Sequence, residues 1–267
     1  MTDKKTGKSK RSSRLLAFLL VAFLIIFAGS GAMFAKELLQ REKEKSAYEQ
    51  MNSELQQAVE QATEQKQDED TNAGELVLEH YAKLKEQNKD FVGWISIEGT
   101  PLSYPVVHTP DDTEYYLRRA FDGSYAVSGT PFLGEACDVN STNVLIYGHR
   151  MNDDTMFTTL LDYAEKEFWE THREIRFDTV DKLQNYEVFA AFYIEIPAED
   201  NPDAFRWYNY SGNISGDDFT DYISRLKAHA YYDTEVSVTE GDKLITLTTC
   251  AYNNETHRFV VVAKLKQ

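Results

Sequence analysis

The chain has 267 residues, of which 42% are hydrophobic and 13% aromatic, and its formal net charge is -16. This length and apolar content suffice for one sizeable folded domain with additional segments. Residues 1–14 contain six Lys and Arg side chains and one acidic residue, Asp3. The net charge of the rest of the chain is therefore more negative than that of the whole chain. Phosphate binding requires clustered Lys and Arg, and the acidic composition therefore argues against a nucleic-acid partner.

The segment 15–35, LLAFLLVAFLIIFAGSGAMFA, contains no charged residue. As a helix it would be roughly 30 Å long, which matches the hydrocarbon thickness of a bilayer. The apolar core of a cleaved signal peptide is usually shorter, about 7–15 residues, so we predict an uncleaved transmembrane signal-anchor at 15–35. The basic tail 1–14 precedes it, which predicts a cytoplasmic N-terminus and an extracytoplasmic remainder.

A charged, Gln- and Glu-rich segment follows the predicted anchor. Apolar residues recur in it at loose helical spacing, without sustained heptads, which predicts a juxtamembrane helix or stalk. The acidic, Asn- and Gly-containing stretch 68–74 is typical of a flexible break. We therefore divide the chain into a stalk or linker at 36–74 and a folded domain at 75–267.

The predicted domain begins with a short amphipathic helix at 75–88 and then changes to strand and turn patterns. Further helical patterns occur at 155–163 and 217–230, and Asp217 and Asp218 are expected to cap the latter. Many short strands separated by turns favour a mainly β fold with peripheral helices, a closed or nearly closed β-barrel. The strands are expected at 91–97, 102–107, 129–133, 143–147, 174–178, 186–196, 243–249 and 258–265.

Cys250 ends the strand-like run LITLTTC, and Arg258 opens the next apolar run after a short polar loop. Adjacent strands would bring the thiol and the guanidinium together, where a positive charge favours the thiolate and can hold a developing oxyanion. Arg stays charged at neutral pH and so cannot donate the proton. The backbone N–H of Ala251 is a second candidate oxyanion donor, and Thr248 and Thr249 are candidates for substrate contact.

His149 is the expected proton carrier. It follows the apolar run Val144–Tyr147, and we expect Gly148 to let the chain turn so that the imidazole projects from the end of the strand. A structural role is the more frequent fate of a histidine, and we favour that role for the rival candidates His108 and His257. An alternative for the two cysteines is a structural disulfide between Cys137 and Cys250, since an exported domain can form one.

Taken together, these motifs resemble those of the sortases, membrane-anchored cysteine transpeptidases of Gram-positive bacteria. Thr246–Cys250 resembles the family's TLxTC motif, with an arginine eight residues later and the histidine of YGH about a hundred residues earlier. The resemblance covers nearly all of 75–267. The helix at 75–88 and the long segment around 217–230 resemble class B members. The segment 88–95 resembles the opening strand of the family, and the short motifs at 121–123 and 128–130 also resemble sortase sequences.

The resemblance implies a sortase-like barrel and a reaction that uses Cys250, His149 and Arg258. The cysteine would cleave a C-terminal sorting signal of a secreted protein and form a thioester. An amine of the lipid-linked peptidoglycan precursor, or a pilin lysine, would then resolve it. No cofactor is expected, because the acidic pairs at 111–112 and 217–218 are typical of solvated faces and helix caps rather than of calcium sites. Alternatives are a hydrolytic extracytoplasmic cysteine peptidase and a non-catalytic membrane-anchored binding module.

Overall fold

The computed structural model describes residues 7–64, 73–198, 200–201, 203–250 and 256–266. The chain divides into two compact units, Met1–Ala47 and Tyr48–Gln267. Helix α1 (Gly7–Glu64) supplies the described part of the first unit and continues into the second. Within it lies one segment long and apolar enough to cross a membrane, and the hydrophobic side chains of that segment are exposed. The segment predicted as an anchor, 15–35, and residues 36–64 of the predicted stalk or linker thus lie in one continuous helix.

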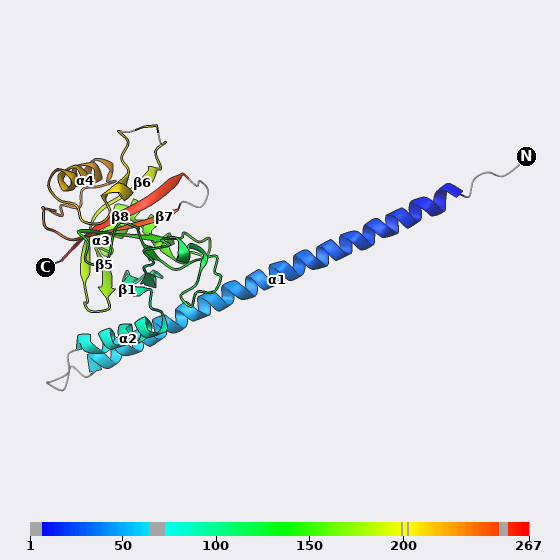
Figure 1. The fold of residues 1–267 in the computed structure, drawn as a ribbon, viewed down its shortest axis with the longest axis horizontal. Helices are drawn as coiled ribbons and strands as arrows, with labels where there is room; N and C mark the ends of the chain where they lie inside the picture. Colours follow the sequence, from blue (N-terminus) through cyan, green and yellow to red (C-terminus); the bar gives the residue numbers. More distant parts are fainter. Residues whose placement is uncertain (1–6, 65–72, 199, 202, 251–255, 267) are drawn as a thin grey trace, which may run out of the picture. The chain divides into compact units, whose positions relative to one another are not determined.

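The second unit is built around a closed eight-stranded barrel, which confirms the predicted fold class (Figure 1). The strands follow the order β1-β2-β3-β4-β7-β8-β6-β5, and β5 closes the barrel by pairing with β1. Of the eight neighbouring pairs, only β2–β3 and β4–β7 are parallel. The strands are β1 (Phe91–Ser96), β2 (Ser103–Val107), β3 (Phe132–Leu133), β4 (Asn143–Gly148), β5 (Glu174–Thr179), β6 (Asn185–Glu195), β7 (Leu244–Cys250) and β8 (His257–Leu265).

The strands β4, β7 and β8 are buried along most of their lengths. Helix α4 (Gly216–His229) packs against β6 and, through Tyr222, against β7. Phe219, Tyr222, Ile223 and Leu226 form the buried face of α4. The hydroxyl of Tyr222 lies 2.7 Å from Oγ1 of Thr246 on β7, and this hydrogen bond fixes the helix against the strand. Burial on both faces explains why these strands read as continuous β-branched and apolar runs rather than as alternating patterns.

The other helices differ from expectation in type and boundary. The segment predicted as a helix at 155–163 is a 3-10 helix, η3 (Phe157–Ala164), which begins after Met156 with φ of 58°. Two further 3-10 helices, η2 (Tyr115–Arg118) and η4 (Trp207–Tyr210), and the short helix α3 (Lys166–Thr171) were not predicted. Segments of four to eight residues carry too few periodic positions to stand out in a sequence.

The predicted cap of α4 is corrected by the structure. Ser215 is the N-cap residue, and it makes no side-chain capping hydrogen bond. Asp217 and Asp218 lie in the first turn, where their negative charge favours the helix N-terminus without capping it.

Helix α2 (Ala73–Gln87) and the residues of α1 from Tyr48 onward pack on the barrel. Met51 and Leu55 of α1 contact a cluster that contains Tyr81 and Leu84 of α2. Asn52 donates a hydrogen bond to the carbonyl of Ser103 on β2. The division of the chain at residues 74 and 75 remains a prediction, and the expected break at 68–74 lies mostly outside the described residues.

Replacement of Tyr81 by phenylalanine is expected to lower the free energy of unfolding by about 1–2 kcal/mol, the usual cost of removing a buried hydrogen bond. The Tyr81 hydroxyl donates at 2.8 Å to the carboxylate of Asp178, a residue of β5 that is fully buried. Urea unfolding of the protein in detergent measures the change. Tyr115→Phe is the control, because the Tyr115 side chain is exposed. Equal stability of both variants would contradict the expectation.

Candidate active site

Three neighbouring strands bring the expected site residues to one end of the barrel. In the parallel pair β4–β7, Gly148 lies opposite Thr249. In the antiparallel pair β7–β8, Cys250 lies opposite Arg258. Because His149 directly follows Gly148, its backbone lies beside the end of β7 that carries Cys250. The side chain of Cys250 lies outside the described residues. Figure 1 shows β7 and β8 side by side along the barrel wall.

His149 is half-buried and held at two points. Its carbonyl accepts a hydrogen bond from the backbone N–H of Phe157 at 2.9 Å. Its Nε2 lies 2.8 Å from the carbonyl oxygen of Leu117 in η2. Since a carbonyl can only accept, Nε2 carries the hydrogen, and Nδ1 is the acceptor nitrogen of the neutral ring.

The electrostatic surroundings of His149 favour the neutral ring. Burial lowers the pKa of His149 below its ordinary value, and the nearby positive charge of Arg118 lowers it further. The hydrogen bond to the Leu117 carbonyl acts in the opposite direction. At neutral pH the imidazole is therefore uncharged, and it can accept a proton.

Gly148 has a different role from the one expected. It is not among the glycines with positive φ, so the structure gives no support to a special turn at this position. A Cβ atom at Gly148 would instead lie 2.6 Å from the ring of Phe157. The glycine allows the Phe157 ring to pack directly on the backbone that precedes His149, and it thereby fixes the position of the histidine.

Arg258 is half-buried at the start of β8, and its Nη1 donates to the carbonyl of His257 at 2.9 Å. The guanidinium acts electrostatically on Tyr147, the residue two positions before His149. Burial raises the pKa of Tyr147 to about 12, and the charge of Arg258 opposes this shift. The Arg258 guanidinium on β8 is therefore close enough to β4 for its charge to affect Tyr147. This is the end of the barrel where the expected site residues lie.

The two threonines before Cys250 are buried in β7. Thr248 lies opposite Tyr147 and Val260, and Thr249 lies opposite Gly148 and Phe259. The hydroxyl of Thr248 has no hydrogen-bond partner among the residues that the structure describes. Ala251, expected to supply a backbone N–H, lies outside the described residues.

Cys137 is a buried free thiol, which contradicts the alternative of a structural disulfide with Cys250. Its Sγ lies 3.4 Å from the carbonyl oxygen of Gly134 and 3.6 Å from that of Leu145. Burial raises the pKa of the Cys137 thiol. A thiol with these surroundings is protonated at neutral pH and a poor nucleophile.

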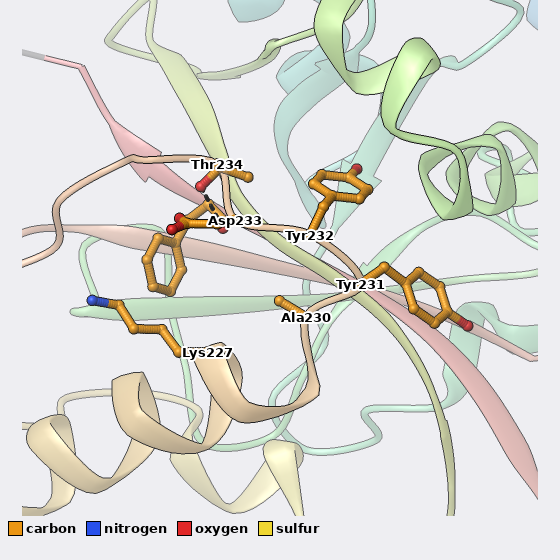
Figure 2. Close-up of a pocket in the computed structure, with 7 residues that line it drawn as sticks. Lys227, Ala230, Tyr231, Tyr232, Asp233 and Thr234 are labelled. Carbon is orange, nitrogen blue, oxygen red and sulfur yellow. Dashed lines mark hydrogen bonds between the residues drawn. The ribbon is translucent and has the colours of Figure 1, made fainter.

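A separate hollow of about 390 Å³ opens beside the C-terminal end of α4. Figure 2 shows Lys227 and Asp233 on the opposite side from Tyr231, and all three residues line the hollow. None of the predicted catalytic or substrate-binding residues is among those that line this hollow. Its walls come from β6, α4 and the connector that follows α4. In the described part of the chain, no three or more His, Cys, Asp or Glu side chains cluster so that they could hold a metal ion, and the acidic pairs at 111–112 and 217–218 form no such cluster.

Sequence reasoning missed the segment that contacts His149. The Leu117 carbonyl and the Arg118 charge both lie in η2, whose four residues gave no clear pattern. A backbone carbonyl leaves no mark in a sequence. The one residue in the sequence that could have indicated this contact is Gly129, which has a φ of 61° and packs closely against the Leu117 backbone. That glycine belonged to a motif noted above without an assigned role.

Replacement of Arg118 by glutamine is expected to raise the pKa of His149 towards its ordinary value, because it removes a nearby positive charge. NMR titration of the His149 ring measures this pKa directly. Arg119→Gln is the matched control, since the Arg119 guanidinium lies over the Tyr115 ring, 4.4 Å from its centroid. An unchanged His149 pKa in Arg118→Gln, or equal shifts in both variants, would contradict this electrostatic assignment.

A closed barrel in which a cysteine-terminated strand pairs with a strand beginning near an arginine, next to a histidine, defines a candidate site for thiol-based acyl transfer. The family model described as Sortase domain matches residues 95–266. Sortase B of Staphylococcus aureus is 29% identical over 262 residues, which cover 97% of this chain and 98% of that protein. Sortase B of Listeria monocytogenes is 32% identical over 199 residues, 73% of this chain and 77% of the relative.

Solved structures agree with the sequence comparisons. The Staphylococcus aureus sortase B–substrate complex superimposes with a TM-score of 0.68 at 30% identity, covering 86% of this chain and 99% of that one. The chain therefore belongs to the sortase family, in its class B, whose members are cysteine transpeptidases that act on sorting-signal substrates and amine nucleophiles.

Proposed function

We propose that this sortase uses Cys250 as nucleophile, His149 as proton carrier and Arg258 as the cation that stabilises the oxyanion. The observation that carries the proposal is the strand register. It brings Cys250 opposite Arg258 on β8 and sets Thr249 opposite the residue before His149 on β4. This register brings the backbone positions of Cys250, Arg258 and His149 to one end of the barrel, which supports a shared role for the three residues on one substrate carbonyl.

In the first half-reaction, neutral His149 takes the proton of the Cys250 thiol, and the thiolate attacks the carbonyl carbon of the scissile peptide bond. The S–C bond forms, and the carbonyl oxygen becomes an oxyanion held by Arg258. When the C–N bond breaks, protonated His149 gives its proton to the leaving amine. The product is a thioester between the substrate's new carboxyl end and Cys250.

In the second half-reaction, an acceptor amine attacks the thioester carbonyl and loses a proton to His149. The C–S bond then breaks, and the thiolate leaves as the new amide forms. Arg258 stabilises this second oxyanion as it did the first. We assign the backbone N–H of Ala251 as a further donor to both oxyanions, by its position directly after the nucleophile.

Thr248 and Thr249 are proposed to contact the substrate close to the scissile bond. What supports this role for Thr248 is its buried hydroxyl, which lacks a partner among the described residues. A buried hydroxyl without a hydrogen bond costs free energy, and a substrate amide beside it would supply the missing partner.

The proposed substrates are secreted proteins that carry a C-terminal sorting signal with a Thr-Gly or Thr-Asn type bond. The proposed acceptor is an amine of the lipid-linked peptidoglycan precursor or a pilin lysine. We propose that residues 15–35 anchor the enzyme in the cell membrane as a single span, with the basic tail 1–14 in the cytoplasm. The catalytic domain at 75–267 would then lie outside the membrane, near both substrates.

Addition of an amine acceptor tests the transfer step. With a sorting-signal peptide alone, water resolves the thioester slowly and the product is the free acid. With millimolar triglycine we expect the product to shift to the amide conjugate, quantified by mass spectrometry. A product that remains the free acid at every triglycine and diaminopimelic acid concentration would identify a hydrolytic peptidase instead.

A further inference from the structure

The orientation of the His149 ring depends on a backbone carbonyl in the loop between β2 and β3. Nε2 of His149 lies 2.8 Å from the Leu117 oxygen. This hydrogen bond selects the tautomer and directs the acceptor nitrogen Nδ1 away from Leu117. Any shift of the Leu117 carbonyl therefore changes the position of the nitrogen that must exchange protons with the reacting groups.

The Leu117 carbonyl is in turn held by residues 129 and 130. The backbone N–H of Thr130 donates to the Tyr116 carbonyl at 3.1 Å. Gly129 approaches so closely that a Cβ atom there would lie 2.6 Å from the Leu117 oxygen. η2 has only four residues and no side-chain capping hydrogen bond, so these tertiary contacts fix its position.

Residues 129 and 130 are bound by a side chain from α1. The Tyr48 hydroxyl donates to the Gly129 carbonyl at 2.8 Å and lies 3.0 Å from Oγ1 of Thr130. That threonine oxygen donates to the Arg119 carbonyl at 3.0 Å, one residue beyond η2. Tyr48 is 6% exposed, and its ring packs edge-on against Tyr104 at 5.4 Å, so the hydroxyl is held in place.

We propose that Tyr48 is a positioning residue for the proposed proton carrier His149, acting through Gly129, Thr130 and the Leu117 carbonyl. The same helix α1 contains the apolar segment 15–35, so the helix that carries the anchor also supplies a side chain that orders the active site. This inference rests on the proposed function of His149, and it adds a contribution from a segment that sequence reasoning treated as a stalk.

The test compares two single-atom deletions in the full chain, purified in detergent. Tyr48→Phe removes the hydroxyl and keeps the ring against Tyr104. The matched control is Tyr163→Phe, because Tyr163 is fully buried and its hydroxyl also donates to a backbone carbonyl, that of His172, at 2.7 Å. For each variant, kcat and KM for acyl transfer to triglycine and the NMR-measured pKa of His149 are determined.

Tyr48→Phe is expected to lower kcat about 10-fold with KM unchanged, since a displaced catalytic group slows the reaction without weakening binding. It should also lower the pKa of His149, because the Leu117 hydrogen bond favours the protonated ring. Tyr163→Phe should change neither quantity. Thr130→Val, which removes the bridging hydroxyl, should reproduce the effect of Tyr48→Phe.

Unchanged kcat and His149 pKa in Tyr48→Phe, or equal changes in Tyr48→Phe and Tyr163→Phe, would overturn the proposal. A shifted His149 pKa with unchanged kcat would support the positioning chain and contradict the catalytic role of His149. The two hypotheses therefore fail in distinguishable ways.

Discussion

Replacement of Cys250 by alanine is expected to lower the rate of sorting-signal cleavage by roughly 10³-fold or more, because no other group can form the covalent intermediate. Cleavage of fluorogenic peptides that contain a Thr-Gly or Thr-Asn bond measures the rate. The variant should keep the far-ultraviolet circular dichroism of the parent protein, since the change deletes only one sulfur atom.

The chain provides a matched control in its other cysteine. Cys137→Ala also deletes one thiol, but the Cys137 side chain is buried against the carbonyl oxygens of Gly134 and Leu145. We expect this variant to retain the parent rate of cleavage. Full activity of Cys250→Ala, or loss of activity in Cys137→Ala alone, would exclude Cys250 as the nucleophile.

Replacement of His149 by glutamine is the second change with a large expected effect. Glutamine can still donate a hydrogen bond to the Leu117 carbonyl, but it cannot carry a proton, so kcat should fall by about 10²–10⁴-fold. Steady-state kinetics with the same peptides and triglycine give kcat and KM separately. KM should change little, because the histidine acts on the reacting atoms rather than on substrate binding.

His172→Gln is the control for this change. The His172 ring stacks on Phe168 at 4.0 Å and lies close to Gly99, in the turn between β1 and β2. That turn is at the end of β1 and β2 opposite to Phe91 and Val107, which pair with each other. Parent-like kcat in His149→Gln, or an equal loss in His172→Gln, would remove His149 from the mechanism.

The barrel was predictable from sequence because its strands are strongly marked. β-branched and apolar runs in β4, β7 and β8 gave the strands to within one or two residues, and turn residues separated them. The candidate site was predictable because its residues lie at strand ends within recognisable motifs. The strand prediction required no knowledge of which strands are neighbours, and the site prediction required only that the consecutive strands β7 and β8 pair, as they do.

What sequence could not give is the set of contacts between distant segments. The parallel register of β4 and β7 joins residues about a hundred positions apart, and no local pattern encodes it. The contact between His149 and the Leu117 carbonyl depends on backbone atoms, which every residue has. Tyr48 lies in a charged segment that was predicted as a juxtamembrane helix or stalk, and no local pattern showed which partners bury its side chain. Gly148 was read as a turn residue because sequence does not reveal the ring packed against it.

The central claim is that Cys250 carries the acyl group, and an intact-mass measurement tests it most directly. The full chain is mixed with sorting-signal peptides in the absence of an amine, quenched in acid, weighed and mapped by proteolysis. The account predicts one added acyl fragment, located on Cys250 and released by hydroxylamine, as expected of a thioester. An acyl fragment on any other residue, or product formation with no fragment trapped on Cys250 at any time, would contradict it.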